Sequence, residues 1–77
     1  NQILNVYPNP TQNILNIEFS RRKRYELIFL DSNGRLIDTN QLDGSILEKD
    51  ISNYNKGFYY VLVQSESETS FVRIIKN

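Results

Sequence analysis

The chain has 77 residues, enough for one small domain that hides only about 60% of its unfolded surface on folding. Nine lysine and arginine residues balance nine aspartate and glutamate residues, so the broad positive field that nucleic-acid binding requires is missing. The absence of cysteine and histidine excludes disulfides, thiolate metal sites and the usual general base. No apolar run approaches the roughly 20 residues of a membrane span. The chain starts at Asn1 without an initiator methionine, and we interpret it as a fragment of a longer protein.

Short apolar stretches separated by turn residues predict an all-β sandwich or barrel. The segment 13–20 alternates apolar and polar residues, which is typical of a half-buried strand. Residues 25–31 are apolar on both faces and predict a central strand covered on both sides. Residues 58–65 predict a second central strand, whereas 35–42 and 45–52 are more polar and predict outer strands. The seven predicted strands are residues 3–7, 13–20, 25–31, 35–42, 45–52, 58–65 and 70–76.

Glycine marks three predicted turns. The sequence "DSNG" at 31–34 suits a type I turn closed by a left-handed glycine, in which Asp31 caps the turn and pairs with Arg35. The competing interpretation is a type I′ turn centred on Asn33 and Gly34, which shifts the register by one and moves Ile37 to the other face. We favour the bulged form. Further turns at 42–45 and 54–57 would place all three glycines in turns.

Both prolines of the chain lie in "VYPNP" at residues 6–10. Each proline lacks an N–H and holds its predecessor in an extended conformation, so Pro8 and Pro10 exclude this stretch from the middle of a sheet. We expect a stiff crossover between the first two strands, with Asn9 free to hydrogen-bond neighbouring backbone. An ordinary rigid loop is the plain alternative, and the residues alone leave both interpretations open.

The blocks "VYPNP", "NILNIEF", "IFLDSNGRLI", "NKGFYYVLV" and "FVRIIK" make the chain similar, over essentially its whole length, to the C-terminal sorting domain (type A) of the type IX (Por) secretion system. The resemblance implies a seven-stranded immunoglobulin-like antiparallel β-sandwich, with residues 1–77 as one C-terminal sorting domain. Such a domain directs an N-terminal cargo in the same chain through the outer-membrane translocon. The parent protein is then expected, via the periplasm, outside the cell or on the outer-membrane surface.

The resemblance also implies partners and recognition residues. The partners are the translocon and the sortase, which cuts upstream of the domain and attaches the cargo to lipopolysaccharide. The chain departs from the family twice: "NYNKG" lacks the proline often found before the glycine, and Asn77 follows the final lysine. No residue is assigned to catalysis, a cofactor or a metal. The sorting motifs fall on Pro8, Asn9, Pro10, Asp31, Gly34, Arg35, Gly57, Tyr59, Val72, Arg73, Ile74 and Lys76.

Other chemistry has weak support in the sequence. Glu48 and Asp50 would share a strand face near Asp43, but alternating carboxylates on an outer strand are usually solvated, and we predict no enzyme. The acidic stretch 38–44 has Leu42 where a calcium ligand is needed. The basic run "RRKR" at 21–24 predicts a solvated hairpin tip, with binding to anionic glycan or lipopolysaccharide as the alternative.

The aromatic run "FYY" at 58–60 supports an alternative function. Tyr59 alternates in phase with Val61 and Val63, which predicts core packing. Phe58 or Tyr60 could instead lie exposed and stack on sugar rings. The chain would then be an immunoglobulin-like accessory module that binds glycan or a neighbouring domain of the parent enzyme.

Overall fold

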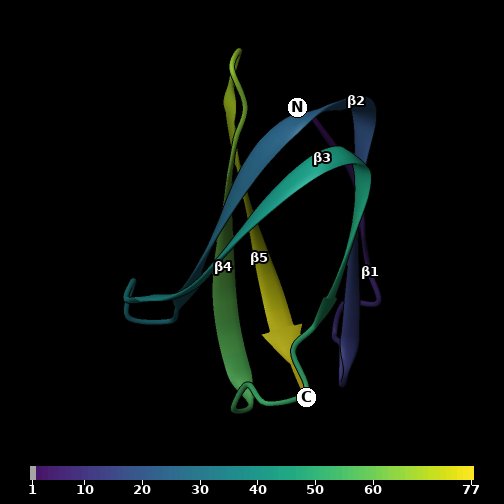
Figure 1. Ribbon diagram of the computed structural model, residues 1–77. Helices are drawn as coiled ribbons and strands as arrows, with labels where there is room; N and C mark the ends of the chain where they lie inside the picture. Colours follow the sequence, from purple (N-terminus) through teal and green to yellow (C-terminus); the bar gives the residue numbers. More distant parts are fainter. Residues whose placement is uncertain (1) are drawn as a thin grey trace.

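The computed structural model describes residues 2–77 as a curled antiparallel sheet (Figure 1). The predicted all-β, antiparallel architecture is confirmed. The strands follow the order β1-β2-β4-β5, and β3 pairs with β2 outside this path. Within residues 2–77 there is no helix of the length and hydropathy needed to cross a membrane. The strands are β1 (Ile3–Tyr7), β2 (Ile14–Asp31), β3 (Leu36–Asp50), β4 (Gly57–Gln64) and β5 (Thr69–Lys76).

Within residues 2–77 there are five strands instead of the predicted seven, because β2 and β3 continue through positions where we expected turns. Residues 21–24, predicted as a hairpin tip, lie inside β2, where the pairing with β3 shifts between Glu18 and Lys23. This run contains no glycine, proline, asparagine or aspartate to reverse the chain, so the strand continues through it. Gly44 lies inside β3 opposite Lys23, and the predicted turn at 42–45 is therefore wrong.

The long strand β2 joins the two halves of the curled sheet. Its first half pairs with β1 and the end of β3, and its second half pairs with the start of β3 and with β4. The curl encloses one core, and the predicted alternation of β2 and of Tyr59, Val61 and Val63 is confirmed. The buried apolar residues are Leu15, Ile17, Phe19, Tyr25, Leu27, Phe29, Leu47, Ile51, Tyr59, Val61, Val63 and Ile74.

Strand β1 departs from simple alternation. Its pairing with β2 shifts between Ile3 and Asn5, so that Ile3 and Val6 both pack against the core while Leu4 is exposed. A bulge inserts one residue into a strand and changes which side chains face inward. The bulge therefore lets Ile3 and Val6, which are three residues apart, face the same core.

In the described part of the chain, residues 2–77, no second layer covers the outer face of β2, β4 and β5. One row across this face joins Ile28, Leu62 and Phe71 through the strand pairing. Ile28 and Leu62 are half-buried by their neighbours, whereas Phe71 is 59% exposed. The central position of residues 25–31 is confirmed by pairing on both sides, but the expected cover over both faces of that strand is wrong.

Candidate functional site

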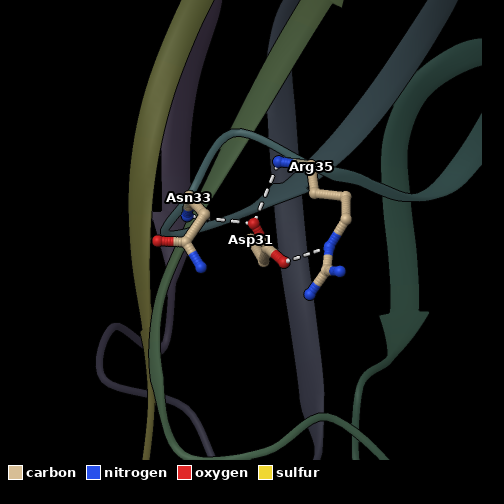
Figure 2. Close-up of polar contacts among 3 residues, drawn as sticks. All are labelled: Asp31, Asn33 and Arg35. Atoms are coloured by element: carbon tan, nitrogen blue, oxygen red, sulfur yellow. Dashed lines mark hydrogen bonds and ion pairs between the residues drawn. The ribbon is translucent and has the colours of Figure 1, made fainter.

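The hairpin between β2 and β3 is organised by one carboxylate (Figure 2). Asp31 Oδ1 accepts hydrogen bonds of 2.9 Å from the backbone N–H groups of Asn33 and Arg35, and Asp31 Oδ2 accepts one of 3.2 Å from Arg35 Nε. The hydrogen bond from the Arg35 backbone N–H, with smaller contributions from the Asn33 N–H and the Arg35 side chain, holds the Asp31 pKa below its ordinary value against the opposing effect of burial. The Asp31 N–H donates to the Arg35 carbonyl, and Gly34 has φ 82°. The bulged form of the turn is therefore confirmed.

The glycine and tyrosine at the start of β4 have different environments. Gly57 begins the strand, whereas Tyr59 is buried and its hydroxyl donates to the Asn55 carbonyl at 2.6 Å. The Tyr59 ring lies 5.0 Å from that of Tyr54. The turn expected at 54–57 lies earlier, because the Tyr54 N–H donates to the Ile51 carbonyl at 3.0 Å and Gly57 already begins β4. Tyr59 connects the segment after this turn to the core.

The Pro-Asn-Pro segment contacts the last strand across the whole length of the sequence. Asn9 Nδ2 donates to the Arg73 carbonyl at 3.3 Å, and the Ile75 N–H donates to Asn9 Oδ1 at 3.0 Å. The expectation that Asn9 bonds neighbouring backbone is wrong, because its partners are 64 and 66 residues away. The prolines flank this side chain, and the peptide bonds before Pro8 and Pro10 are both cis. The segment is thus a crossover that also fastens the chain terminus.

Thr11 extends this contact, and sequence reasoning missed it. Its N–H donates to the Ile75 carbonyl at 2.9 Å, and its carbonyl accepts the Asn77 N–H at 2.9 Å. The side chain is almost fully buried, and its hydroxyl donates to the Ile14 carbonyl at 3.0 Å. A single threonine after Pro10 has no periodicity, so the only signal was its position next to the motif. We call residues 8–11 with their bonds to β5 the terminal clasp.

Strand β5 has one buried face and one exposed face, as its alternation predicts. Ile74 is fully buried and Val72 packs against the core, whereas Arg73 is exposed. The Arg73 guanidinium carbon lies 4.9 Å from the centre of the Phe58 ring, the distance of a cation–π contact. Lys76 Nζ donates to the Asn77 carbonyl at 3.0 Å.

The aromatic side chains on this exposed face cover one another in part. Tyr60 and Phe71 stack with ring centres 5.3 Å apart, and Phe58 has Arg73 over its ring. One face of each of these rings is therefore occupied within the domain. Sugar stacking uses open ring faces, so the glycan-binding interpretation stays a prediction without added support.

The register of the sheet brings the predicted motifs together. Asp31 pairs with Tyr59, and Tyr59 pairs with Ile74. Two pairs further toward the end of β5, Gly57 pairs with Lys76. The terminal clasp adds the Pro-Asn-Pro residues to the same end of β5. Motif residues of the Pro-Asn-Pro segment, the start of β4 and β5 thus lie together where β5 ends, while the β2–β3 hairpin lies on the other side of β4, at the left in Figure 1.

The remaining charged residues are dispersed. Lys23 Nζ donates to Ser67 Oγ at 3.0 Å, while Glu48 and Asp50 point outward on β3. Asp38 pairs with Lys49 at 2.7 Å, a contact that the sequence did not reveal. In the part of the chain that the structure describes, no three acidic, cysteine or histidine side chains cluster as metal ligands do.

The fold and the gathered motifs define a class of protein: a small β-domain that displays a clasped terminal strand. Residues 5–77 match the family model described as the secretion system C-terminal sorting domain. The chain belongs to this family, and it is a C-terminal sorting signal for type IX secretion. Membership implies a type IX system, an N-terminal cargo and export from the cell. A search of curated proteins found no match to the chain.

Proposed function

We propose that the translocon recognises the end of the sheet where β5 terminates, as one folded surface. The observation that carries this proposal is that the terminal clasp and the start of β4 both bond to β5 at this end, while Asp31 of the hairpin motif pairs with β4 next to it. These motifs are far apart in sequence. Recognition of one surface by one partner would explain why they occur together in the sorting signal. The recognised strand is held by main-chain pairing with β4 on one side and by the terminal clasp on the other.

The motif residues divide into two roles under this proposal. Asp31, Gly34 and Tyr59 shape the neighbouring turns and the core, because their polar groups are bonded inside the domain. Arg73 is exposed on β5 with its guanidinium over the Phe58 ring, and Lys76 is part-buried with its ammonium bonded to the Asn77 carbonyl, so both cationic groups lie near the end of β5. The positioning residues therefore affect export through folding, and the displayed residues affect it through contact.

The wider function follows the family. The domain is carried behind its cargo as residues 1–77, does no chemistry itself, and is cut away by a sortase that attaches the cargo to lipopolysaccharide. The destination is the cell exterior or the outer-membrane surface, reached through the periplasm. The two halves of β2 and of β3, taken separately, restore seven segments around one core, which supports an immunoglobulin-like description of the sheet.

Export of a reporter tests the proposed surface. Residues 1–77 fused behind a periplasmic reporter are expected to export it in a type IX-secreting bacterium, and deletion of residues 71–76 is expected to retain it in the periplasm. Because deletion can unfold so small a core, the decisive variant is Arg73→Glu with Lys76→Glu. Its control, Arg21→Glu with Arg22→Glu, makes the same change of charge on exposed residues of β2.

The expected outcome is loss of export for the β5 variant alone, with matching thermal unfolding of both variants. Normal export of the β5 variant would contradict the proposal. Loss of surface retention only in the β2 variant would instead support the basic run as a contact with anionic glycan or lipopolysaccharide.

A further inference from the structure

Three strands have an edge without a partner strand in residues 2–77, because β1 and β3 pair only with β2 and β5 pairs only with β4. Natural sheets protect such edges, since free backbone groups invite pairing with another chain. β1 is short, bulged between Ile3 and Asn5 and followed directly by Pro8. β3 carries two charged residues next to Phe29 of the core. Asp38 pairs with Phe29 in the sheet, and Lys49 Nζ lies 4.9 Å from the centre of the Phe29 ring. Both edges therefore have recognised protective features.

The edge of β5 is protected over only part of its length. Ile75 directs both its N–H and its carbonyl away from β4, to Asn9 and Thr11. Because backbone groups alternate along an antiparallel strand, Phe71 and Arg73 direct theirs the same way. The Arg73 carbonyl is occupied by Asn9. Within residues 2–77, no group bonds to the N–H or carbonyl of Phe71 or to the N–H of Arg73.

The unprotected part spans residues 69–73, which we call the β5 window. It contains no proline, glycine or bulge, and its one charged side chain, Arg73, lies on the outer face over Phe58. Phe71 is 59% exposed in the middle of the window. A flat edge with an exposed aromatic residue is the kind that proteins avoid unless a partner pairs with it.

We propose that the β5 window receives an extended strand from a protein of the translocon, which joins the sheet by strand addition. The alternating free donors and acceptors of the window match the backbone of an extended chain. Side chains of the added strand on the outer face would lie next to Phe71 and Arg73. The terminal clasp closes the edge beyond Arg73 and fixes where the added strand stops. This inference rests on the proposed function, because it specifies how the same strand is recognised.

Replacement of one N–H tests strand addition. Phe71→Pro removes an N–H that has no partner inside the described chain, and proline is tolerated on an edge strand where the N–H faces outward. Phe71→Ala is the matched control, because it removes the same aromatic side chain and keeps the N–H. In the reporter fusion, we expect Phe71→Pro to lower export about two- to ten-fold relative to Phe71→Ala, the effect of one lost hydrogen bond, with cooperative thermal unfolding in both. Thr69→Pro, at the first residue of β5, is the second variant if Phe71→Pro does not fold.

The remaining outcomes separate this inference from the proposed function. Equal export of the folded proline and alanine variants, with loss of export by Arg73→Glu and Lys76→Glu, would overturn strand addition and leave the recognised surface in place. Normal export after deletion of residues 71–76 would overturn the proposed function itself. A fusion that sediments as a dimer, and that Phe71→Pro converts to a monomer, would assign the window to a second copy and overturn the translocon as its occupant.

Discussion

The replacement Asn9→Ala isolates the contribution of the terminal clasp. The change removes two hydrogen bonds, of 3.3 Å and 3.0 Å, between the Asn9 side chain and the backbone of Arg73 and Ile75. A typical hydrogen bond adds about 0.5–1.5 kcal/mol to stability. Both of these bonds are exposed to solvent, so we expect the low end of that range for each, or about 1 kcal/mol in total.

A loss of this size is measurable in a chain of 77 residues. The free energy of unfolding is expected to fall by about 1 kcal/mol, which lowers Tm by about 4–8 °C. Hydrogen exchange adds a local test, because the Ile75 N–H loses its acceptor while the Ile74 N–H stays directed at β4. Exchange at Ile75 should become faster than at Ile74.

The control is Asn13→Ala, which changes the same residue type in the same crossover. The Asn13 side chain is exposed, and a surface substitution of this kind changes stability by less than about 0.5 kcal/mol. Equal Tm values for Asn9→Ala and Asn13→Ala, with unchanged exchange at Ile75, would refute the clasp as a source of stability for β5.

Three further predictions concern the turn, the terminal strand and pH. Gly34→Ala, at φ 82°, is expected to lower the free energy of urea unfolding by about 1–2 kcal/mol, and Gly34→Asn by less. Ile74→Ala should cost about 2–5 kcal/mol by thermal unfolding because Ile74 is fully buried, whereas Phe71→Ala should cost under about 1 kcal/mol; similar values would contradict the assigned faces. The hydrogen bond from Lys49 lowers the Asp38 pKa in the folded protein. The stabilisation of the fold by this pair is therefore fully present above pH about 4, the unfolded-state pKa, and is lost as the pH falls through the lower folded-state pKa. Tm measured from pH 7 to 2 should thus fall more steeply for the wild type than for Asp38→Asn, and parallel curves would exclude this linkage.

The strands and their buried faces could be predicted where local pattern decides them. Tyr59, Val61 and Val63 alternate with outward residues, and the core uses that same alternation. The capped turn at Asp31 was also predictable, because the aspartate and the glycine satisfy the turn within a few residues. Local interactions of this kind leave a clear signal in sequence.

The long strands and the terminal clasp depend on interactions that sequence pattern does not record. Four basic residues separate two apolar stretches in β2, and only pairing with β3 shows that the strand continues through them. Gly44 signals a turn as readily as a bend within a strand. The bonds from Asn9 and Thr11 to β5 join the two ends of the chain, and no local propensity contains that information.

The central claim is that the sorting signal is recognised as a folded surface, in which β4 and the terminal clasp hold β5. Its most direct test is to compare, in one type IX-secreting strain, export of a reporter that ends in residues 1–77 with export of a reporter that ends in residues 69–77 alone. We predict efficient export of the first and periplasmic retention of the second, because an isolated β5 lacks every partner that holds it in the sheet. Equal export of both reporters would show that the strand is recognised as a linear sequence and would contradict this account.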